Sequence, residues 1–241
     1  MEWTADGIVL GVKRHGEANA IIEVLTEERG RHLGLVKGGR SKRLRPILQV
    51  GNHLDLTWRA RLEEHLGTFT VEPKTLRAGV VMASGAGLHL LNTLCALCLL
   101  LAEREAHPRL FRALNVILDS DGGARELSAY LLRFELAFLD ELGFGLDVSK
   151  CAATGGTDDL VYVSPKSGRA VSAEAGAPYH DRMLPLPSCI ITQSFDGASD
   201  ADLLRGLELT GYFLDRHIFE PRSKKLPPSR EKLREMLVSI S

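Results

Sequence analysis

The chain has 241 residues and a formal net charge of −1, and 44% of its residues are hydrophobic while 25% are charged. This composition is ordinary for a globular protein and excludes a uniformly basic one, so a nucleic-acid surface would depend on where the charges are placed. Four cysteines are too few for a disulfide framework in a chain of this length. Because the first residues also lack the layout of a signal peptide, we expect a cytoplasmic protein.

Short strands separated by turn signals are predicted up to about residue 80. Apolar runs with partial alternation indicate five of them, at 7–14, 20–26, 31–37, 47–59 and 66–72. Five strands in so short a segment favour a closed barrel, because closure removes exposed strand edges. The OB-fold is the commonest five-stranded solution, although an SH3-like barrel has a similar strand count.

From about residue 82 onward the apolar period becomes helical. Helices are expected at 87–105, 108–118, 125–142, 200–219 and 229–238, the last with Ser229 as its N-cap. The segment 144–198 is rich in Gly, Pro, Ser and Asp, which predicts an irregular insert with a small hairpin at 160–164 and 168–171. We therefore predict an α+β protein of two domains, a barrel at 1–80 and an all-helical domain at 81–241 that carries the insert.

One apolar stretch, Val80–Ala102, contains no Asp, Glu, Lys or Arg and is long enough to cross a bilayer. It also contains polar residues that hydrocarbon would leave unsatisfied, namely Ser84, His89, Asn92 and Thr93. A helix buried in the protein core explains both features, so we expect no membrane contact.

A cluster of basic residues between the second and fourth predicted strands carries the strongest functional signal. It has no Asp or Glu and contains seven cations, Arg29, Arg31, Lys37, Arg40, Lys42, Arg43 and Arg45. Such a cluster favours a nucleic-acid backbone, because each neutralised phosphate releases condensed counterions. Gly38 and Gly39 in its middle would let the backbone approach a phosphate closely. The spacing of a P-loop is absent, and a solvated basic loop is the alternative interpretation.

A second basic cluster near the C-terminus also contains Glu220, Glu231 and Glu235. These acids make the polar face of a terminal helix an equally good explanation. Candidates for secondary contacts with DNA or a partner protein are Arg222, Lys224, Lys225 and Arg230, and Lys232 and Arg234 complete the cluster.

Aromatic platforms for base stacking would be Trp3, Trp58 or Phe69, all in strand-like runs. Core packing is the more frequent role of such residues. Stacking is therefore not established by the sequence.

The sequence offers no recognisable catalytic or metal-binding motif, since HExxH, GxSxG and GxGxxG are absent. We predict no catalytic residue and no cofactor. Cys95 and Cys98 have zinc-ligand spacing, but they fall inside the apolar helix and are expected in the core. An enzyme site in the insert is left open by His180, Asp181 and the pair 158–159.

Several segments together resemble the RecO family of DNA repair and recombination mediators over nearly the whole chain. They are the LVKGGRSK loop, the run FELAFLDELGFGLDVSKC, the segment YVSPKSGRAVS and the closing PRSKKLPPSREKLREML, which occupy Leu35–Lys42, Phe134–Cys151, Tyr162–Ser172 and Pro221–Leu237. The resemblance implies an OB-fold followed by a helical domain with a zinc-finger-like insert, and no catalytic turnover. It also implies a nucleoid-associated protein that binds single- and double-stranded DNA and anneals complementary strands. Such a protein would work with RecR to load RecA on strands coated by SSB, with RecF as a further partner.

Carried onto this chain, the resemblance assigns the DNA-facing loop to Lys37, Gly38, Arg40, Lys42 and Arg43. Arg31 and Arg45 of the same basic cluster are further candidate DNA contacts. The tail of SSB would need an apolar groove rimmed by cations, for which the helical part offers Arg104, Arg109, Arg112, Arg125 and Arg133. The barrel alone does not distinguish DNA from RNA. An RNA-binding OB-fold protein is therefore the alternative function.

The insert departs from the family pattern. Many members hold zinc with two CxxC pairs, whereas here Cys151 is followed at the pair position by Thr154, and the second pair falls on Ser172 and Ala175. These residues cannot supply four thiolates. We therefore expect an insert that is retained without metal and is held by hydrogen bonds and proline-rich packing.

Overall fold

The computed structural model describes residues 1–239. The chain forms two compact units, Met1–Asp121 and Gly122–Ser241, and each is described separately below. The strands of the barrel end at Thr75, and the first three helices belong to the same compact unit as the barrel. The division into domains at residue 80 stays a prediction.

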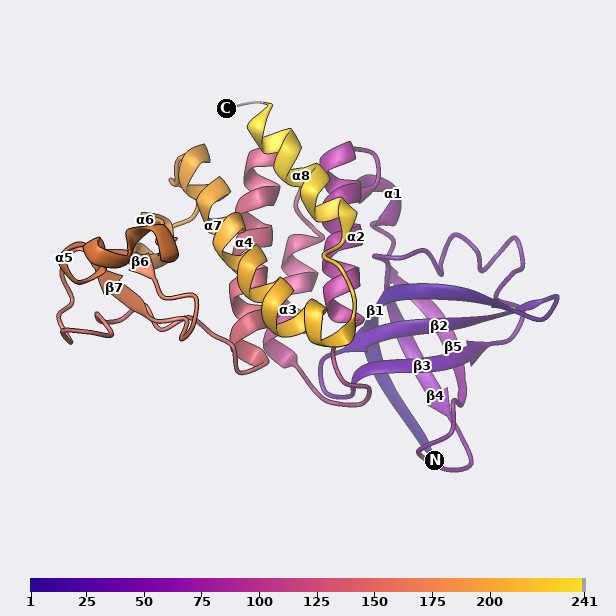
Figure 1. Ribbon diagram of the computed structural model, residues 1–241. Coiled ribbons are helices and arrows are strands. Elements are labelled where there is room, and N and C mark those ends of the chain that lie inside the picture. Colours follow the sequence, from indigo (N-terminus) through magenta and orange to yellow (C-terminus); the bar gives the residue numbers. More distant parts are fainter. Residues whose placement is uncertain (240–241) are drawn as a thin grey trace. The chain divides into compact units, whose positions relative to one another are not determined.

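Five strands of the described chain close into a barrel in the first unit (Figure 1). They are β1 (Glu2–His15), β2 (Asn19–Thr26), β3 (Gly30–Val36), β4 (His53–Arg59) and β5 (Thr68–Thr75). Their order around the barrel is β1-β2-β3-β5-β4, with β1 pairing with both β2 and β4. The barrel closes where β3 meets β5 in parallel, at Leu35 and Thr68. The predicted OB-fold is confirmed.

Alternate residues of the strands fill the barrel. The side chains of Ile22 and Val24 on β2 and of Leu54, Leu56 and Trp58 on β4 all belong to one buried apolar cluster. Each follows the two-residue period of a strand with one face toward the core. Full burial of one such side chain contributes about 1.5–3 kcal/mol, so this alternation supplies much of the stability of the barrel.

The segment between β3 and β4 differs from the sequence prediction. Residues 47–52 were expected to begin a long strand, but the whole stretch 41–51 consists of turns. Its backbone is helical in places, with Leu48 N–H donating to Leu44 O at 2.9 Å. Leu44 and Leu48 therefore lie one helical turn apart, and both pack into the barrel core. The strand begins only at His53 because these leucines plug the barrel instead of extending a strand.

The helices of the first unit are α1 (Ala78–Val81), α2 (Gly85–Cys98) and α3 (Pro108–Ile117). Helix α2 begins after Ser84, whose side chain accepts a hydrogen bond from Gly87 N–H. Four of its five leucines are buried, namely Leu90, Leu91, Leu94 and Leu97, which confirms a core helix. No helix within residues 1–239 is long and apolar enough to cross a membrane.

Helix α2 ends seven residues before its predicted end at Glu105, because the chain leaves the helix to run along β3. Arg104 N–H donates to Arg31 O at 2.8 Å, and Glu103 forms a parallel bridge with Arg31. Gly30, with φ +63°, permits this approach, since a Cβ there would lie 1.8 Å from Glu105 O. The linker therefore becomes part of the barrel unit.

The second unit is built on α4 (Ala124–Glu141), α7 (Asp200–Leu214) and α8 (Pro228–Val238). Helix α7 continues into a π-helical turn, Asp215–Phe219, where the sequence predicted ordinary helix. The prediction of Ser229 as an N-cap is wrong, because Pro228 occupies the first helical position and Pro227 precedes it.

The insert of the second unit has more regular structure than expected. The predicted hairpin forms as β6 (Leu160–Val163) and β7 (Ala170–Ser172), and β8 (Leu184–Pro185) joins it in the order β7-β6-β8. Two short helices, α5 (Ala173–Gly176) and α6 (Ser188–Thr192), accompany this sheet.

Candidate nucleic-acid interface

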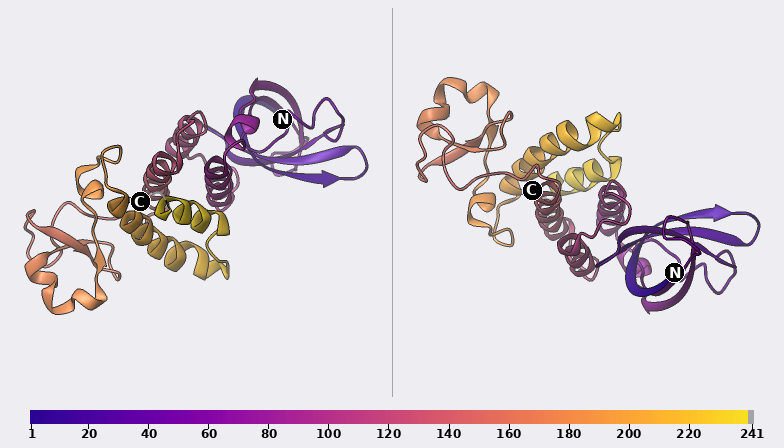
Figure 2. Two further views of the ribbon diagram at one scale, coloured as in Figure 1. Left: turned by 90° about the horizontal axis from the view of Figure 1, so that it is seen from above. Right: turned by 90° about the horizontal axis from the view of Figure 1, so that it is seen from below.

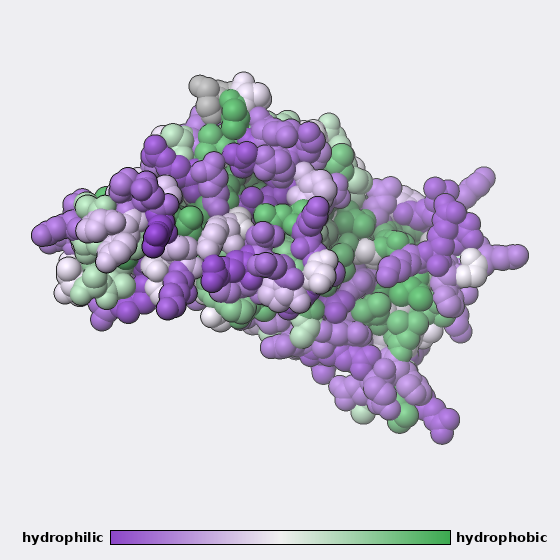
Figure 3. Space-filling view, in the orientation of Figure 1, coloured by the Kyte–Doolittle hydropathy of each residue, from purple (hydrophilic) through white to green (hydrophobic). Residues whose placement is uncertain are grey.

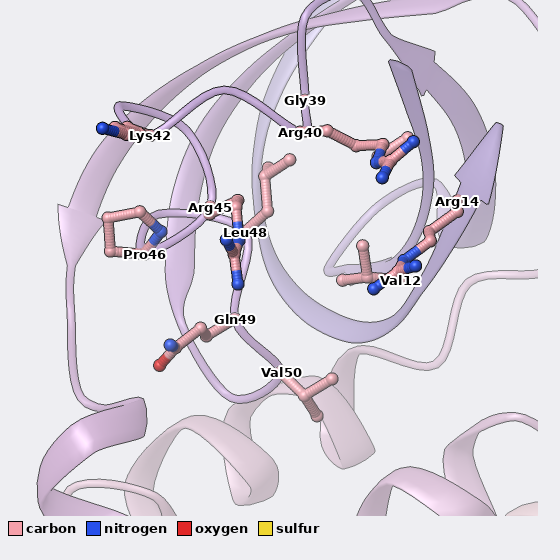
Figure 4. A pocket seen from close by; sticks show the side chains of 11 residues that line it. Val12, Arg14, Gly39, Arg40, Lys42, Arg45, Pro46, Leu48, Gln49 and Val50 are labelled. Carbon is pink, nitrogen blue, oxygen red and sulfur yellow. The ribbon is translucent and has the colours of Figure 1, made fainter. Parts of the chain in front are cut away.

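A pocket of about 710 Å³ lies at one end of the barrel. The hairpin of β1 and β2 extends past the closed part of the barrel (Figure 2), and the turns after β3 face it. Residues from both segments form the walls of the pocket, which are shown in Figure 4: Val12, Arg14, Ala20, Gly39, Arg40, Lys42, Arg45, Pro46, Leu48, Gln49 and Val50.

The walls of this pocket carry charge of one sign. Four of the wall residues within 1–239 are cationic and none is acidic. Figure 4 shows the guanidinium groups of Arg14 and Arg40 on one side of the pocket and that of Arg45 on the other. Like charges around a concave surface raise the local positive potential. The pocket is therefore suited to an anion such as phosphate.

The burial of Leu44 and Leu48 in the barrel explains why the cations of the same segment face outward. Because Leu44 and Leu48 point into the barrel, the neighbouring Lys42, Arg43 and Arg45 turn to solvent. In the part of the chain that the structure describes, no acidic side chain pairs with these three residues or with the exposed Lys37. Their charges are free to meet a ligand.

Arg40 has a positioning role as well as a charge. Its Nη1 donates to Gly16 O at 3.1 Å and to Glu17 O at 2.6 Å, and its backbone N–H donates to Ala18 O at 3.0 Å. These bonds fasten the loop after β3 to the tip of the β1–β2 hairpin. A substitution of Arg40 would therefore disturb the shape of the pocket as well as its charge.

The glycines of this loop do not serve the purpose that the sequence suggested. Gly38 N–H donates to Asn19 Oδ1 at 3.0 Å and Gly39 N–H to Val36 O at 3.2 Å, so neither is free for a phosphate. Gly38 adopts φ +65°, and a Cβ on Gly39 would lie 2.8 Å from Ala20 Cβ. The glycines thus form the turn and permit close packing on the hairpin, while side chains supply the anion-binding groups.

The predicted role of Arg31 as a DNA contact is also corrected by the structure. Its guanidinium is paired with Glu23, its Nε donates to Leu101 O at 2.8 Å, and only 18% of its side chain is exposed. Arg31 therefore holds the chain after α2 against the barrel and is not a free cation of the interface.

Residues of β1 were missed by the sequence prediction. Arg14 and Val12 belong to the pocket because β1 and β2 continue as a hairpin beside the end of β3. Once β1, β2 and β3 are placed as neighbours, a cation just before the turn at His15 would be expected to approach the loop after β3. The sequence therefore shows the cation Arg14, but its place in the pocket can be inferred only when the order of the strands is known.

The outer surface of the barrel beside the pocket is apolar. Ile21 pairs with Leu35 across β2 and β3, and both residues and Leu33 are partly exposed. Figure 3 shows hydrophobic residues gathered on this face, with hydrophilic side chains projecting at the hairpin end. The barrel thus offers an apolar surface next to a cationic one.

The aromatic candidates for stacking lie in the barrel core. Trp58 and Phe69 are buried, and Trp58 Nε1–H donates to Leu66 O at 3.0 Å. Trp3 is half-buried and stacks on Trp58, with ring centroids 5.6 Å apart. The predicted core role of these rings is confirmed.

His32 sits among these rings, 5.0 Å from the rings of both Trp3 and Trp58. Neither ring nitrogen has a hydrogen-bond partner within the described chain. Burial, assisted by the positive charges of Arg104 and Arg29, lowers the pKa of His32 to about 4. The ring is therefore neutral at pH 7.

The C-terminal basic cluster is largely committed to structure. Arg230 is buried, and its Nε and Nη2 donate to the two carboxylate oxygens of Glu135 at 2.7 and 2.9 Å. Its assignment as a contact residue is therefore wrong. Arg234 pairs with Glu231 and Glu208, and Lys232 pairs with Glu235. Exposed cations of the cluster are Arg222, Lys224 and Lys225.

The insert does not fit a zinc ion. Cys151 Sγ lies 3.5 Å from Ser172 Oγ, and Ser172 N–H donates to the same sulfur at 3.3 Å. Hydrogen bonds from Ser172 and Thr154 lower the pKa of Cys151 to about 6. Among residues 1–239 no group of three His, Cys, Asp or Glu side chains is placed to hold a metal. A hydrogen-bonded cluster occupies this part of the insert.

The other cysteines and the residues considered for catalysis show no assembled site in the described chain. Cys95 and Cys98 are buried in α2, and burial raises the pKa of Cys95 to about 12. His180 Nε2 lies 2.9 Å from its exposed neighbour Asp181. Asp158 and Asp159 are exposed to solvent.

A closed five-stranded barrel with a cationic pocket at its hairpin end defines an OB-fold protein of the oligonucleotide-binding class. Residues 1–76 match the family model for the N-terminal part of recombination protein O, and residues 85–227 match the model for its C-terminal part. The chain therefore belongs to the RecO family of DNA repair proteins.

Curated relatives support the same assignment. The chain is 53% identical to the DNA repair protein RecO of Bradyrhizobium sp. (strain ORS 278), over 96% of this chain and 94% of the relative. It is 51% identical to the RecO proteins of Methylocella silvestris and Rhizobium johnstonii. These alignments cover 95% and 96% of this chain, and 93% and 90% of the relatives.

Proposed function

We propose that this protein is a recombination mediator that binds single- and double-stranded DNA through the barrel pocket and anneals complementary strands. With RecR it would help RecA to replace SSB on single strands. The observation that carries the proposal is the acid-free pocket with the cations Arg14, Arg40, Lys42 and Arg45. The role requires binding and release without a chemical step.

Annealing has a physical basis in this pocket. Two complementary strands repel one another through their phosphates, and cations that neutralise phosphates lower this barrier while releasing counterions. Lys42 and Arg45 are exposed and face no acidic partner in the described chain, so their charges are not screened by the protein. Ile21, Leu33 and Leu35 beside the pocket give bases an apolar surface to contact.

The test is annealing of complementary oligonucleotides coated with SSB, with and without the protein. The combined variant Lys42→Ala with Arg45→Ala removes two pocket charges without touching the bonds made by Arg40. We expect slower annealing and weaker DNA binding. Lys166→Ala with Arg182→Ala removes the same charge from the insert and serves as the matched control. Wild-type annealing by the pocket variant would exclude the pocket from the mechanism.

Docking of the SSB tail is also a proposal, for which Arg133 is the favoured candidate. Of the candidate arginines, Arg112 is paired with Glu27 and Arg125 with Asp200. Arg133 is exposed and its guanidinium lies 5.7 Å from the ring centre of Phe195. Phe195 itself is buried, so the ring holds the Arg133 guanidinium in place and the exposed cation suits the acidic part of such a tail. Loss of SSB-tail binding in Arg133→Ala, by fluorescence anisotropy, would support this site, and unchanged binding would exclude it.

The contacts with RecR and RecF are proposed on the family resemblance. Co-sedimentation of the purified proteins tests both. Failure to associate with RecR, with and without DNA, would contradict the mediator role.

A further inference from the structure

A ladder of parallel rings lies in the second unit, outside the proposed DNA pocket. His217 stacks on Phe144 with ring centroids 4.7 Å apart and planes inclined by 9°. His217 also stacks on Phe213, with ring centroids 5.9 Å apart and planes inclined by 13°. Phe213 is buried, whereas 38% of Phe144 is exposed. The ladder therefore begins in the core and ends at the surface.

Local backbone structure presents the outermost ring. Gly143, at the end of α4, adopts φ +82°, and Phe144 N–H folds back to donate to Leu139 O at 2.8 Å. The π-helical turn 215–219 carries His217 beneath this ring. His217 covers one face of Phe144, and 38% of Phe144 remains exposed. A further flat ring could continue the ladder there.

The segment that carries His217 contains cations as well as the acidic residues Asp215 and Glu220. Arg216, next to His217, donates from Nη1 to Tyr212 Oη at 2.8 Å and lies 6.0 Å from the centre of that ring. The turn that follows folds back on the same segment, since Arg222 Nη1 donates to Ile218 O and Lys224 N–H donates to Phe219 O. This turn, between α7 and α8 in Figure 1, also carries the exposed Lys225.

We propose that Phe144 is a stacking platform for an unpaired base of single-stranded DNA, with Arg216 and the turn 222–225 contacting the flanking phosphates. The proposal rests on the DNA-binding function proposed above and adds a second site for single strands. An exposed aromatic ring that stacks on a base, combined with cations that contact the backbone, is the combination by which sequence-independent single-strand binding is achieved. A duplex keeps its bases stacked internally, so the platform selects single strands.

The test uses the full chain and the variants Phe144→Ala and Phe144→Trp. Three fluorescent probes are compared by anisotropy: an oligothymidine, a strand of the same length with abasic sites, and a duplex. Phe144→Ala should bind the oligothymidine at least about fivefold more weakly, the loss expected for one stacked base at about 1 kcal/mol. The abasic strand and the duplex should bind as they do to wild type, and Phe144→Trp should restore binding to the oligothymidine.

A matched control is Tyr179→Ala, which removes an aromatic residue that is 57% exposed. No parallel ring stacks behind Tyr179 in the described chain, so this variant should bind like wild type. Equal weakening on all three probes, or unchanged binding of the oligothymidine, would overturn the platform.

The two proposals fail separately. If Lys42→Ala with Arg45→Ala weakens binding and Phe144→Ala does not, the pocket stands and the platform is overturned. Absence of DNA binding by the wild-type protein would overturn the proposed function itself.

Discussion

Two basic segments that look alike in sequence have different fates in the structure. The first, at 37–45, follows β3 and places its cations at the surface with no acidic partner in the described chain. The second, on α8 at 230–234, buries Arg230 on Glu135 and pairs Arg234 and Lys232 with nearby glutamates. Local acids, rather than the number of cations, decide which charges remain available to a ligand.

Paired and unpaired cations also differ in whether they contribute to stability or to binding. A buried ion pair holds helices together only while both partners are present. Exposed unpaired cations contribute little to folding and are available for phosphate. Substitutions in the two segments should therefore produce opposite patterns of effect.

The largest expected effect is loss of stability in Arg230→Ala. Removing the guanidinium leaves the Glu135 carboxylate buried without its partner, at a cost of about 3–5 kcal/mol. Urea denaturation followed by circular dichroism measures the free energy of unfolding of the second unit. Arg234→Ala, which breaks partly exposed pairs with Glu231 and Glu208, should cost less than about 1 kcal/mol and is the control. Equal stability of the two variants would remove the distinction between buried and exposed pairs.

Lowering the pH is expected to destabilise the barrel unit by a smaller amount. The folded-state pKa of His32 is about 4, below its ordinary value of 6.5, because burial and two nearby arginines disfavour the charged ring. The folded state therefore favours the neutral form, and stability present above pH 6.5 is lost as the pH falls toward 4. The loss should reach roughly 2–3 kcal/mol.

His32→Leu tests this acid sensitivity. The variant lacks the titrating ring, so its free energy of unfolding should change less between pH 6.5 and pH 4 than that of the wild type. Parallel pH profiles for the two proteins would show that His32 does not titrate in this way.

The smallest of these effects is expected on the pKa of Cys151 in the insert. Hydrogen bonds from Ser172 and Thr154 lower the pKa of Cys151 to about 6, so Ser172→Ala should raise that pKa. Thiolate absorbance measured against pH reports the shift. A chelator should leave the thermal unfolding of the wild type unchanged. About one zinc per chain in elemental analysis would contradict a metal-free insert.

Much of the fold follows from the sequence, because alternation and helical periodicity are local signals. The strands at 20–26, 31–37 and 66–72 and the helix starting at Pro108 were predicted close to their observed positions, whereas β1 begins earlier than predicted, at Glu2. The turns at 41–51 were not, since the apolar residues Ile47 and Leu48 suit a strand as well as a plug. Their role depends on the barrel that surrounds them.

The candidate site was predicted only in part. Lys37, Lys42, Arg43 and Arg45 are exposed as a run of cations without acids suggests. The structural roles of Arg31 and Arg230 depend on glutamates 8 and 95 residues away, which no local pattern reveals. Arg14 likewise enters the site only through strand pairing.

The central claim is that the unpaired cations of the pocket, and not the paired cations of α8, contact DNA phosphates. Binding of a single-stranded oligonucleotide as a function of salt tests it most directly. Lys42→Ala with Arg45→Ala should weaken binding and reduce the slope of log K against log salt by about 1.4, since each lost phosphate contact removes about 0.7. Lys232→Ala with Arg234→Ala should leave both affinity and slope unchanged. A wild-type slope in the pocket variant, or an equal reduction in the α8 variant, would contradict the account.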